Sequence, residues 1–419
     1  MRIWYRNLDV TVIAAWVGLV LIGLVAIYST THGPKAEFLL ESVRRNFNRQ
    51  MIWVVISIVT ATVILVLPVR FYQNAAFPAY IVCLLLLVAA LLFGPTINGA
   101  RSWLRLGGIG LQVSEVAKVG TVLAVAQLLS SRRAQKAPIR YGFLTVLLIL
   151  VPALIIVLQN DTGTAIVFVA LIPIMLFWSG FPFSTVILLV SPAIAGYLAL
   201  VYRPAAIVFA LVVTVVLFFQ TRERYVAALA FLLTAGTTAL TSFTLSRVLS
   251  SYQAARVLSF TNPEAEEYRY TVGFHLVQSK AAIGSGGITG KGFMQGTQTQ
   301  GDYIPEQSTD FIFSVIGEEF GFVGAIIVLA VFAYLLIRLV KIGVQMKHPF
   351  GVMTAAGAAG IFLVHLFVNI GMATGLLPVI GIPLPFISYG GSALLANTII
   401  LAIVLDLYMR RDDLSIYGY

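Results

Sequence analysis

The chain has 419 residues, of which 59% are hydrophobic and 11% are charged, and its formal net charge is +10. Soluble globular proteins carry about 25% charged residues, so this composition excludes an ordinary soluble domain and indicates a membrane, where charge inside a span is costly. The basic balance then predicts contact with anionic lipid headgroups or a phosphorylated lipid, and not with nucleic acid. Cys83 is the sole cysteine, which excludes an intramolecular disulfide.

About twelve apolar runs are long enough to cross the hydrocarbon core as helices, which takes roughly 20 residues each. In chain order the runs cover 10–31, 51–69, 75–94, 113–130, 142–158, 164–180, 184–201, 204–220, 225–244, 312–338, 351–374 and 391–409. The sequence therefore predicts an all-α polytopic membrane protein in which 1–419 forms one transmembrane domain. An even number of spans puts both termini on the same side.

Lysine and arginine in short loops favour the cytoplasmic side of a membrane. They gather on the predicted face that holds both termini, at Arg2, Arg6, Arg70, Arg132, Arg133, Arg222, Arg224, Arg338 and Arg410. The termini are therefore predicted to be cytoplasmic, and 246–310 becomes a large external loop. Within it, 274–283 is predicted to form a short amphipathic helix at the membrane interface. Arg49 and its basic neighbours break the trend on the external side, either as tolerated exceptions or as ligands.

Asp310 is the first candidate for chemistry, because it lies at the external mouth of the predicted helix 312–338. Pro305 and Glu306 precede it, and both residue types suit the first turn of a helix. Asp310 and Glu306 are then either helix-starting residues only, or a carboxylate near apolar surroundings that is suited to act as a base. Position alone does not choose between these two interpretations.

Glu115 and Lys118 lie three residues apart within an apolar run, so they share one helix face. Opposite charges inside a span are expected to be paired and buried in the bundle or a cavity. The pair either positions the helix or lines a polar cavity that holds a substrate. Arg101 precedes this helix and can bind phosphate with two parallel hydrogen bonds. Asp161 joins two predicted helices and can cap the second.

Two glycine- and proline-rich segments remain. The run 284–292 departs from a Walker A loop, and it is either an anion-binding turn or a flexible turn. The run 383–392 places irregular backbone at membrane depth, where it must be buried in protein or line a wet cavity. We find no zinc motif, nucleotide fingerprint or serine nucleophile elbow.

Taken together, these motifs resemble the SEDS family of bacterial shape, elongation, division and sporulation proteins. The matching segments are 99–118, 159–165, 252–263, 278–324 and 383–392. Residues 296–298 look more like the elongation branch, RodA, than the division branch, FtsW. The resemblance implies a peptidoglycan glycosyltransferase that polymerises lipid II on the outer face of the bacterial cytoplasmic membrane, for cell elongation and rod shape.

The resemblance also implies site residues and partners. Asp310 matches the family's essential carboxylate, and Glu115 with Lys118 matches its membrane-embedded ion pair. Further substrate-binding positions are Arg49, Arg101, Asp161, Lys280 and Glu306. The expected partners are lipid II, a class B penicillin-binding protein, the elongation machinery and membrane lipids, without nucleic acid. No nucleotide or organic cofactor is implied, while the hypothesis admits a divalent cation, Mg²⁺ or Mn²⁺, at Asp310.

The chain departs from the family in its number of spans, which is usually ten. Three apolar runs within 184–244 stand where one is expected, so this segment is predicted to contain an inserted helical hairpin. The expected reaction is a single inverting displacement with polyprenyl pyrophosphate as leaving group. Two alternatives stay open: a flippase that transports the lipid-linked precursor, and a non-catalytic scaffold for a transpeptidase.

Overall fold

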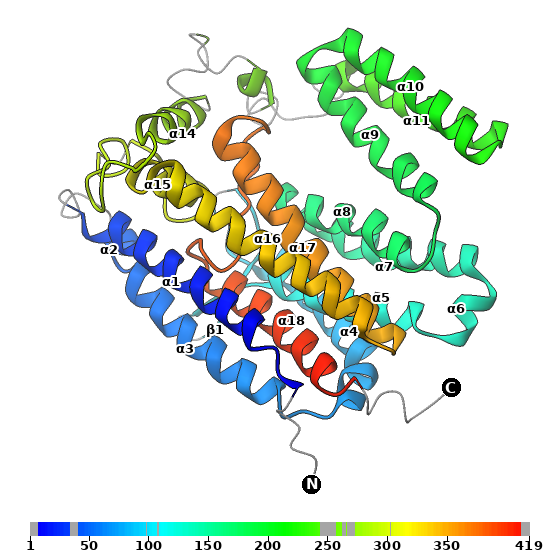
Figure 1. The fold of residues 1–419 in the computed structure, drawn as a ribbon, viewed down its shortest axis with the longest axis horizontal. Coiled ribbons are helices and arrows are strands. Elements are labelled where there is room, and N and C mark those ends of the chain that lie inside the picture. The colour runs from blue at the N-terminus through cyan, green and yellow to red at the C-terminus, as the bar shows by residue number, and fades with distance from the viewer. Residues whose placement is uncertain are drawn as a thin grey trace. The chain divides into compact units, whose positions relative to one another are not determined.

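A computed structural model of the protein describes residues 7–33, 41–97, 99–106, 109–243, 257–261, 265, 273–301 and 303–411. Its long helices follow the predicted apolar runs except at 312–338, where the chain forms two helices (Figure 1). They are α1 (Val10–His32), α3 (Asn46–Ile64), α4 (Val69–Phe93), α5 (Val113–Leu129), α7 (Pro138–Leu158), α8 (Thr162–Trp178), α9 (Phe183–Val201), α10 (Arg203–Thr221), α11 (Arg224–Phe243), α16 (Gly321–Gln345), α17 (Pro349–Thr374) and α18 (Gly391–Met409). Within the described residues, ten helices are long and apolar enough to cross a membrane. The predicted all-α polytopic architecture is confirmed.

Shorter elements connect these helices. They are α2 (Glu41–Arg44), α6 (Arg132–Lys136), α14 (Phe274–Ser285) and α15 (Ile312–Glu319), with two short strands, β1 (Trp103–Leu106) and β2 (Ile109–Gln112). The strands pair antiparallel, with Trp103 opposite Gln112. This hairpin was not predicted. The predicted helix 274–283 is confirmed as α14, whereas its location at a membrane interface stays a prediction. Arg2, Arg6 and most of the segment 252–263 lie outside the described residues.

The chain divides into two compact units. The first holds Met1–Met175, Gln278–Thr374 and Ile380–Tyr419, and the second holds Leu176–Val277 with Gly375–Val379. In the second unit, α9, α10 and α11 pack around a core that contains Val213, Leu217 and Ala230. These three helices cover the segment in which an inserted hairpin is predicted, and that insertion stays a prediction.

Among the candidate membrane-spanning helices, α17 and α18 are the most buried, and α5 packs against both. Small residues let α17 take this central place, because they allow helix backbones to approach closely. A Cβ on Gly357 would lie 2.4 Å from a Val122 methyl on α5, and one on Gly360 would lie 3.1 Å from Leu171 on α8. The neighbouring helices therefore pack directly against the α17 backbone.

The predicted single helix 312–338 is wrong, because the chain breaks between α15 and α16. Gly321 at the break has φ +64°, and a Cβ there would lie 2.3 Å from the Gly290 amide nitrogen. The chain after the break pairs with the glycine run, since the Phe322 N–H donates to the Gly287 carbonyl at 2.9 Å. Packing against this distant segment thus overrides a continuous helical pattern.

The first turn of α3 also differs from its prediction, because the helix begins at Asn46 and not at 51. Asn46 and Gln50 are polar, and both are buried. Their side chains bond to distant loops and so extend the helix beyond its apolar run. The Asn46 amide reaches Ser308 Oγ at 3.4 Å, and the Gln50 amide donates to the Ser388 carbonyl at 3.4 Å.

Candidate active site

Asp310 lies in a tight turn that leads into α15. The amides of Asp310 and Phe311 both donate to the Glu306 carbonyl, at 3.0 and 3.3 Å. Glu306 itself has φ +53°, a left-handed conformation that is uncommon for a residue with a side chain. Phe311 is the N-cap residue of α15, so Asp310 precedes the helix. Its side chain is partly exposed, and substrate access therefore does not require unfolding.

The segment 380–390 forms hydrogen bonds with the backbone carbonyls of this turn. Ser388 Oγ donates to the Thr309 carbonyl at 2.6 Å, and the Tyr389 N–H donates to the Ser308 carbonyl at 2.8 Å. From α17, Asn369 Nδ2 donates to the carbonyls of Asp310 and Ile382, at 2.9 and 2.7 Å. Two sequence motifs more than 70 residues apart therefore form one rigid unit around Asp310.

Helix α3 supports the same unit from another direction. The Gln50 side chain accepts from the Gly390 N–H at 3.2 Å in addition to its bond to the Ser388 carbonyl. Arg49 precedes Gln50 in this turn, and its side chain is exposed. Arg49 is thus on the helix whose Gln50 contacts Ser388 and Gly390, and its role in substrate binding stays a prediction.

Gly381 packs closely against the Asp310 carboxylate. It has φ +81°, and a Cβ there would lie 3.1 Å from Asp310 Oδ2. Gly381→Ala is therefore expected to displace Asp310 or the loop, and to reduce, by about 10- to 100-fold, the lipid II polymerisation that the sequence resemblance implies, since a shift of ~1 Å is enough for such a loss. Turnover of purified protein measures this effect. Gly236→Ala is the control, because nothing lies within 4 Å of its added Cβ. Full activity of Gly381→Ala would contradict the close fit.

The predicted ion pair of α5 is present and fully buried. Lys118 Nζ lies 2.9 Å from Glu115 Oε2, and the two side chains are 1% and 2% exposed. Lys118 Nζ also lies 2.7 Å from His365 Nε2, and His365 Nδ1 lies 2.9 Å from the Pro383 carbonyl oxygen. His365 was not among the site residues predicted from the sequence. A usable signal existed, because His365 and Asn369 are polar and four residues apart within one apolar helix.

Arg101 and Asp161 join two of the motifs, 99–118 and 159–165. The Arg101 N–H donates to the Gln159 carbonyl at 2.9 Å, while its side chain is exposed. Asp161 Oδ1 accepts from the Thr164 N–H at 3.1 Å, which confirms the predicted cap of α8. Asp161 Oδ2 accepts from Gln112 Nε2 at 3.2 Å. Through these bonds the segments around 101, 112 and 161 share one site.

The other two candidates are exposed. Lys280 lies on α14 and is exposed. The preceding residue, Ser279, is buried, and its Oγ lies 2.6 Å from both Ser314 Oγ and the Ala373 carbonyl oxygen. Glu306 accepts from Thr309 Oγ1 at 3.0 Å. Exposure therefore separates the candidates into two groups. Arg49, Arg101, Lys280 and Glu306 are accessible to a substrate, and Glu115 and Lys118 are not.

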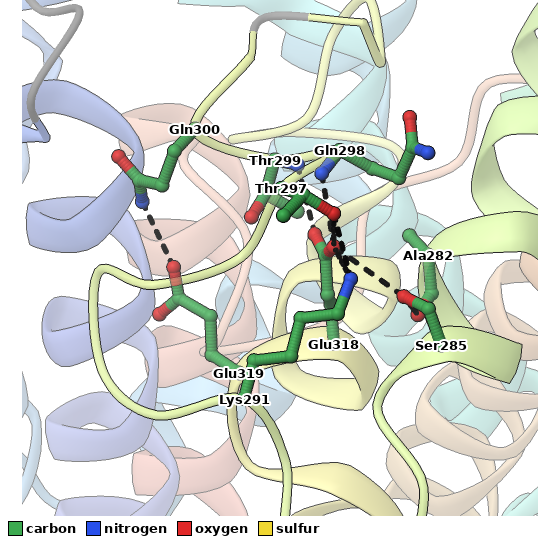
Figure 2. Close-up of polar contacts among 9 residues, drawn as sticks. All are labelled: Ala282, Ser285, Lys291, Thr297, Gln298, Thr299, Gln300, Glu318 and Glu319. Atoms are coloured by element: carbon green, nitrogen blue, oxygen red, sulfur yellow. Dashed lines mark hydrogen bonds and ion pairs between the residues drawn. The ribbon is translucent and has the colours of Figure 1, made fainter.

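Glu318, at the end of α15, organises the loop that follows the glycine run (Figure 2). Its Oε1 accepts from Lys291 Nζ at 2.7 Å and from the Gln298 N–H at 2.9 Å, and its Oε2 accepts from the Thr299 N–H at 2.8 Å. Burial by itself would raise the pKa of this carboxyl, but the hydrogen bonds from Gln298, Lys291 and Thr299 outweigh it and hold the pKa below the usual value.

The glycine run is an ordered turn built around α15. The amides of Lys291 and Gly292 donate to the carbonyls of Glu318 and Glu319, each at 3.0 Å. The Lys291 ammonium is paired with the Glu318 carboxylate of the same chain. The amides of Lys291 and Gly292 and the Lys291 ammonium therefore bind groups of the protein itself, while the choice between an anion-binding turn and a flexible turn stays a prediction.

A family model described as cell-cycle protein, covering FtsW, RodA and SpoVE, matches residues 9–206 and 203–413 of the chain. The peptidoglycan glycosyltransferase MrdB of Escherichia coli (strain K12) is 34% identical over 362 residues, 86% of this chain and 85% of that protein. The peptidoglycan glycosyltransferase RodA of Treponema pallidum (strain Nichols) is 31% identical over 432 residues, 97% of this chain and 98% of that protein.

Solved structures share the fold. RodA of Thermus thermophilus, a rod shape determining protein, is 25% identical with a TM-score of 0.62, over 97% of this chain and 98% of that one. A chain from a peptidoglycan synthase complex, described as coordinating polymerization and crosslinking, is 27% identical with a TM-score of 0.71. It aligns over 96% of this chain and 98% of its own length.

Proposed function

Because the chain belongs to the FtsW, RodA and SpoVE family of cell-cycle proteins, we propose that it polymerises lipid II into glycan strands on the outer face of the bacterial cytoplasmic membrane. It is a multi-pass membrane protein and a peptidoglycan glycosyltransferase. The relatives named MrdB and RodA support a role in cell elongation. The proposed orientation has both termini in the cytoplasm, as the loop cations favour.

One observation carries the proposed mechanism: the turn that bears Asp310 is held from α3, from α17 and from the 380–390 segment, while the residue Asp310 stays partly exposed. A general base must be held at a fixed position to be effective. Asp310 takes the proton from a sugar hydroxyl of the acceptor, and the resulting oxygen attacks the anomeric carbon of the donor. The bond from that carbon to the pyrophosphate breaks with inversion, and the polyprenyl pyrophosphate leaves with the electron pair.

The leaving pyrophosphate gains negative charge, which cationic side chains stabilise. Arg49, Arg101 and Lys280 are exposed and are proposed to serve this purpose, and Glu306 and Asp161 are proposed to shape the same surface. A divalent cation, Mg²⁺ or Mn²⁺, would have Asp310 as its protein ligand. Among the described residues no three His, Cys, Asp or Glu side chains cluster to hold a metal. Mg²⁺ commonly uses one or two carboxylates together with substrate phosphates, so a single carboxylate fits such an ion.

A class B penicillin-binding protein is the proposed partner, because it would cross-link the strands that this enzyme forms. The similarity to a chain of a peptidoglycan synthase complex supports this proposal. The elongation machinery and the surrounding membrane lipids are proposed as further partners.

A flippase and a non-catalytic scaffold are the rival functions, and one assay separates the polymerase from both of them. Purified protein in detergent micelles, without a sealed membrane, is incubated with purified lipid II, and glycan strands are resolved by gel electrophoresis. We expect strands to form, either with the protein alone or after addition of the transpeptidase. Transport yields no product in micelles. Absence of strands in both conditions would overturn the proposed function.

A further inference from the structure

Three buried polar side chains meet where α5 packs against α17 in the first unit. Glu115, Lys118 and His365 are 2%, 1% and 1% exposed, so none of them touches a substrate at the protein surface. A buried ion pair is seldom more stabilising than well-packed apolar side chains, because both charges must be desolvated. Stability alone therefore gives a weak reason for these charges, and their geometry suggests another role.

The directions of its two hydrogen bonds show how His365 links Lys118 to the Pro383 carbonyl. The Pro383 carbonyl can only accept, so His365 Nδ1 carries the hydrogen of their 2.9 Å bond. Nε2 of the neutral ring is then an acceptor, and Lys118 Nζ donates to it at 2.7 Å. Lys118 is in turn oriented by Glu115 at 2.9 Å. The ion pair thus orients the imidazole, and the imidazole holds one backbone carbonyl of the 380–390 segment.

The Pro383 carbonyl belongs to the part of 380–390 that packs against Asp310. Gly381, two residues before Pro383, closes against Asp310 Oδ2. Asn369, one helical turn after His365, binds the carbonyls of Ile382 and Asp310 together. Two α17 side chains, four residues apart, therefore form hydrogen bonds with the carbonyls of residues 382 and 383. A shift of these two residues would move the Asp310 carboxylate.

We infer that His365 is a positioning residue, which holds the Pro383 carbonyl and thereby sets the Asp310 carboxylate, with the Glu115–Lys118 pair fixing the imidazole. This inference rests on the proposed function, in which Asp310 is the base. It gives the buried pair an indirect role in place of direct substrate contact.

Steady-state polymerisation of lipid II by the purified full-length protein tests the inference. His365→Phe keeps a ring but removes both bonds, and we expect kcat to fall about 10- to 100-fold with KM within about twofold, because Asp310 is displaced while the binding surface is retained. His365→Gln supplies an amide oxygen for Lys118 and an N–H for Pro383, and we expect it to retain at least about a third of the wild-type kcat. Thr354→Val is the control, since the hydroxyl of this buried α17 residue, within the described part of the chain, donates to the Phe350 carbonyl of its own helix and to no other group.

A coupling measurement separates positioning from general packing. Lys118→Met combined with Glu115→Gln should lower kcat, and adding His365→Phe should lower it little further, because all three residues act through one contact. If the kcat losses of the double variant and of His365→Phe instead multiply in the triple variant, the inference is overturned. If His365→Phe does not fold, the comparison of His365→Gln with His365→Asn tests the inference instead. The shorter Asn side chain reaches only one of the two partners, so its kcat should be lower. Equal kcat for these two variants would overturn the inference.

The outcomes also separate this inference from the proposed function. Unchanged kcat in His365→Phe, together with inactive Asp310→Asn, would remove the positioning role and leave the glycosyltransferase mechanism in place. A wild-type protein that forms no strands, with or without the transpeptidase, would remove the mechanism itself.

Discussion

Asp310→Asn is expected to abolish measurable lipid II polymerisation. The amide keeps the shape of the side chain but cannot take a proton from the acceptor hydroxyl, and loss of a general base typically costs about 100- to 10,000-fold in rate. The turn itself should persist, because its bonds to Asn369, Ser388 and Tyr389 use backbone atoms of 308–310. Strand synthesis from purified lipid II in detergent measures the effect.

Two variants make this test specific. Glu223→Gln makes the same change from carboxylate to amide at an exposed residue between α10 and α11, and should keep full activity. Asp310→Glu keeps a carboxylate but lengthens the side chain against Gly381, so an activity between wild type and Asp310→Asn is expected. If Asp310→Asn is folded and fully active, another group must be the base.

The second large effect is on stability, at Glu318. Glu318→Ala removes the acceptor for Lys291 and for the N–H groups of Gln298 and Thr299. Deleting one partner of a buried, hydrogen-bonded charge pair costs about 3 kcal/mol or more, so the free energy of unfolding should fall by about this amount. Cys83 is buried, so unfolding in detergent can be followed by the reaction of its thiol with a fluorogenic dye. Glu41→Gln, at an exposed surface pair, is the control with little expected change.

The same carboxylate predicts a pH dependence. Because the pKa of Glu318 is lower in the folded protein than in the unfolded chain, its stabilisation is complete above the unfolded value of about 4.3 and is lost as the pH falls through the folded pKa. The wild type should therefore lose stability in acid more steeply than Glu318→Ala. Parallel acid profiles of the two proteins would contradict this assignment.

Glu319 provides a matched neighbour for this measurement. Burial raises its pKa and prevails over its hydrogen bonds from Ser29 and Gln300. Its charged form is therefore disfavoured in the folded state, and stability that is present below the unfolded pKa is lost as the pH rises through the folded pKa. Glu319→Gln should leave the acid loss due to Glu318 intact, so the two adjacent residues are distinguishable by the direction of their effects.

The helical architecture could be predicted from local sequence. A span in lipid must satisfy its backbone hydrogen bonds within itself, so the length of an apolar run located most of the long helices, with 312–338 as the exception. The Glu115–Lys118 pair was predictable for the same local reason, because a three-residue spacing fixes their relation on one helix. Asp310 could be selected as a candidate from its motif, and its role as the base stays a proposal.

The arrangement that gives Asp310 its surroundings could not be predicted in this way. His365 meets Lys118 across 247 residues, Asn46 meets Ser308 across 262, and Gln50 meets Ser388 across 338. The break between α15 and α16 likewise depends on a glycine run some thirty residues earlier. Helix length and spacing are properties of neighbouring residues, whereas these contacts exist only once separate helices pack, because close approach of backbones determines which polar groups can reach one another.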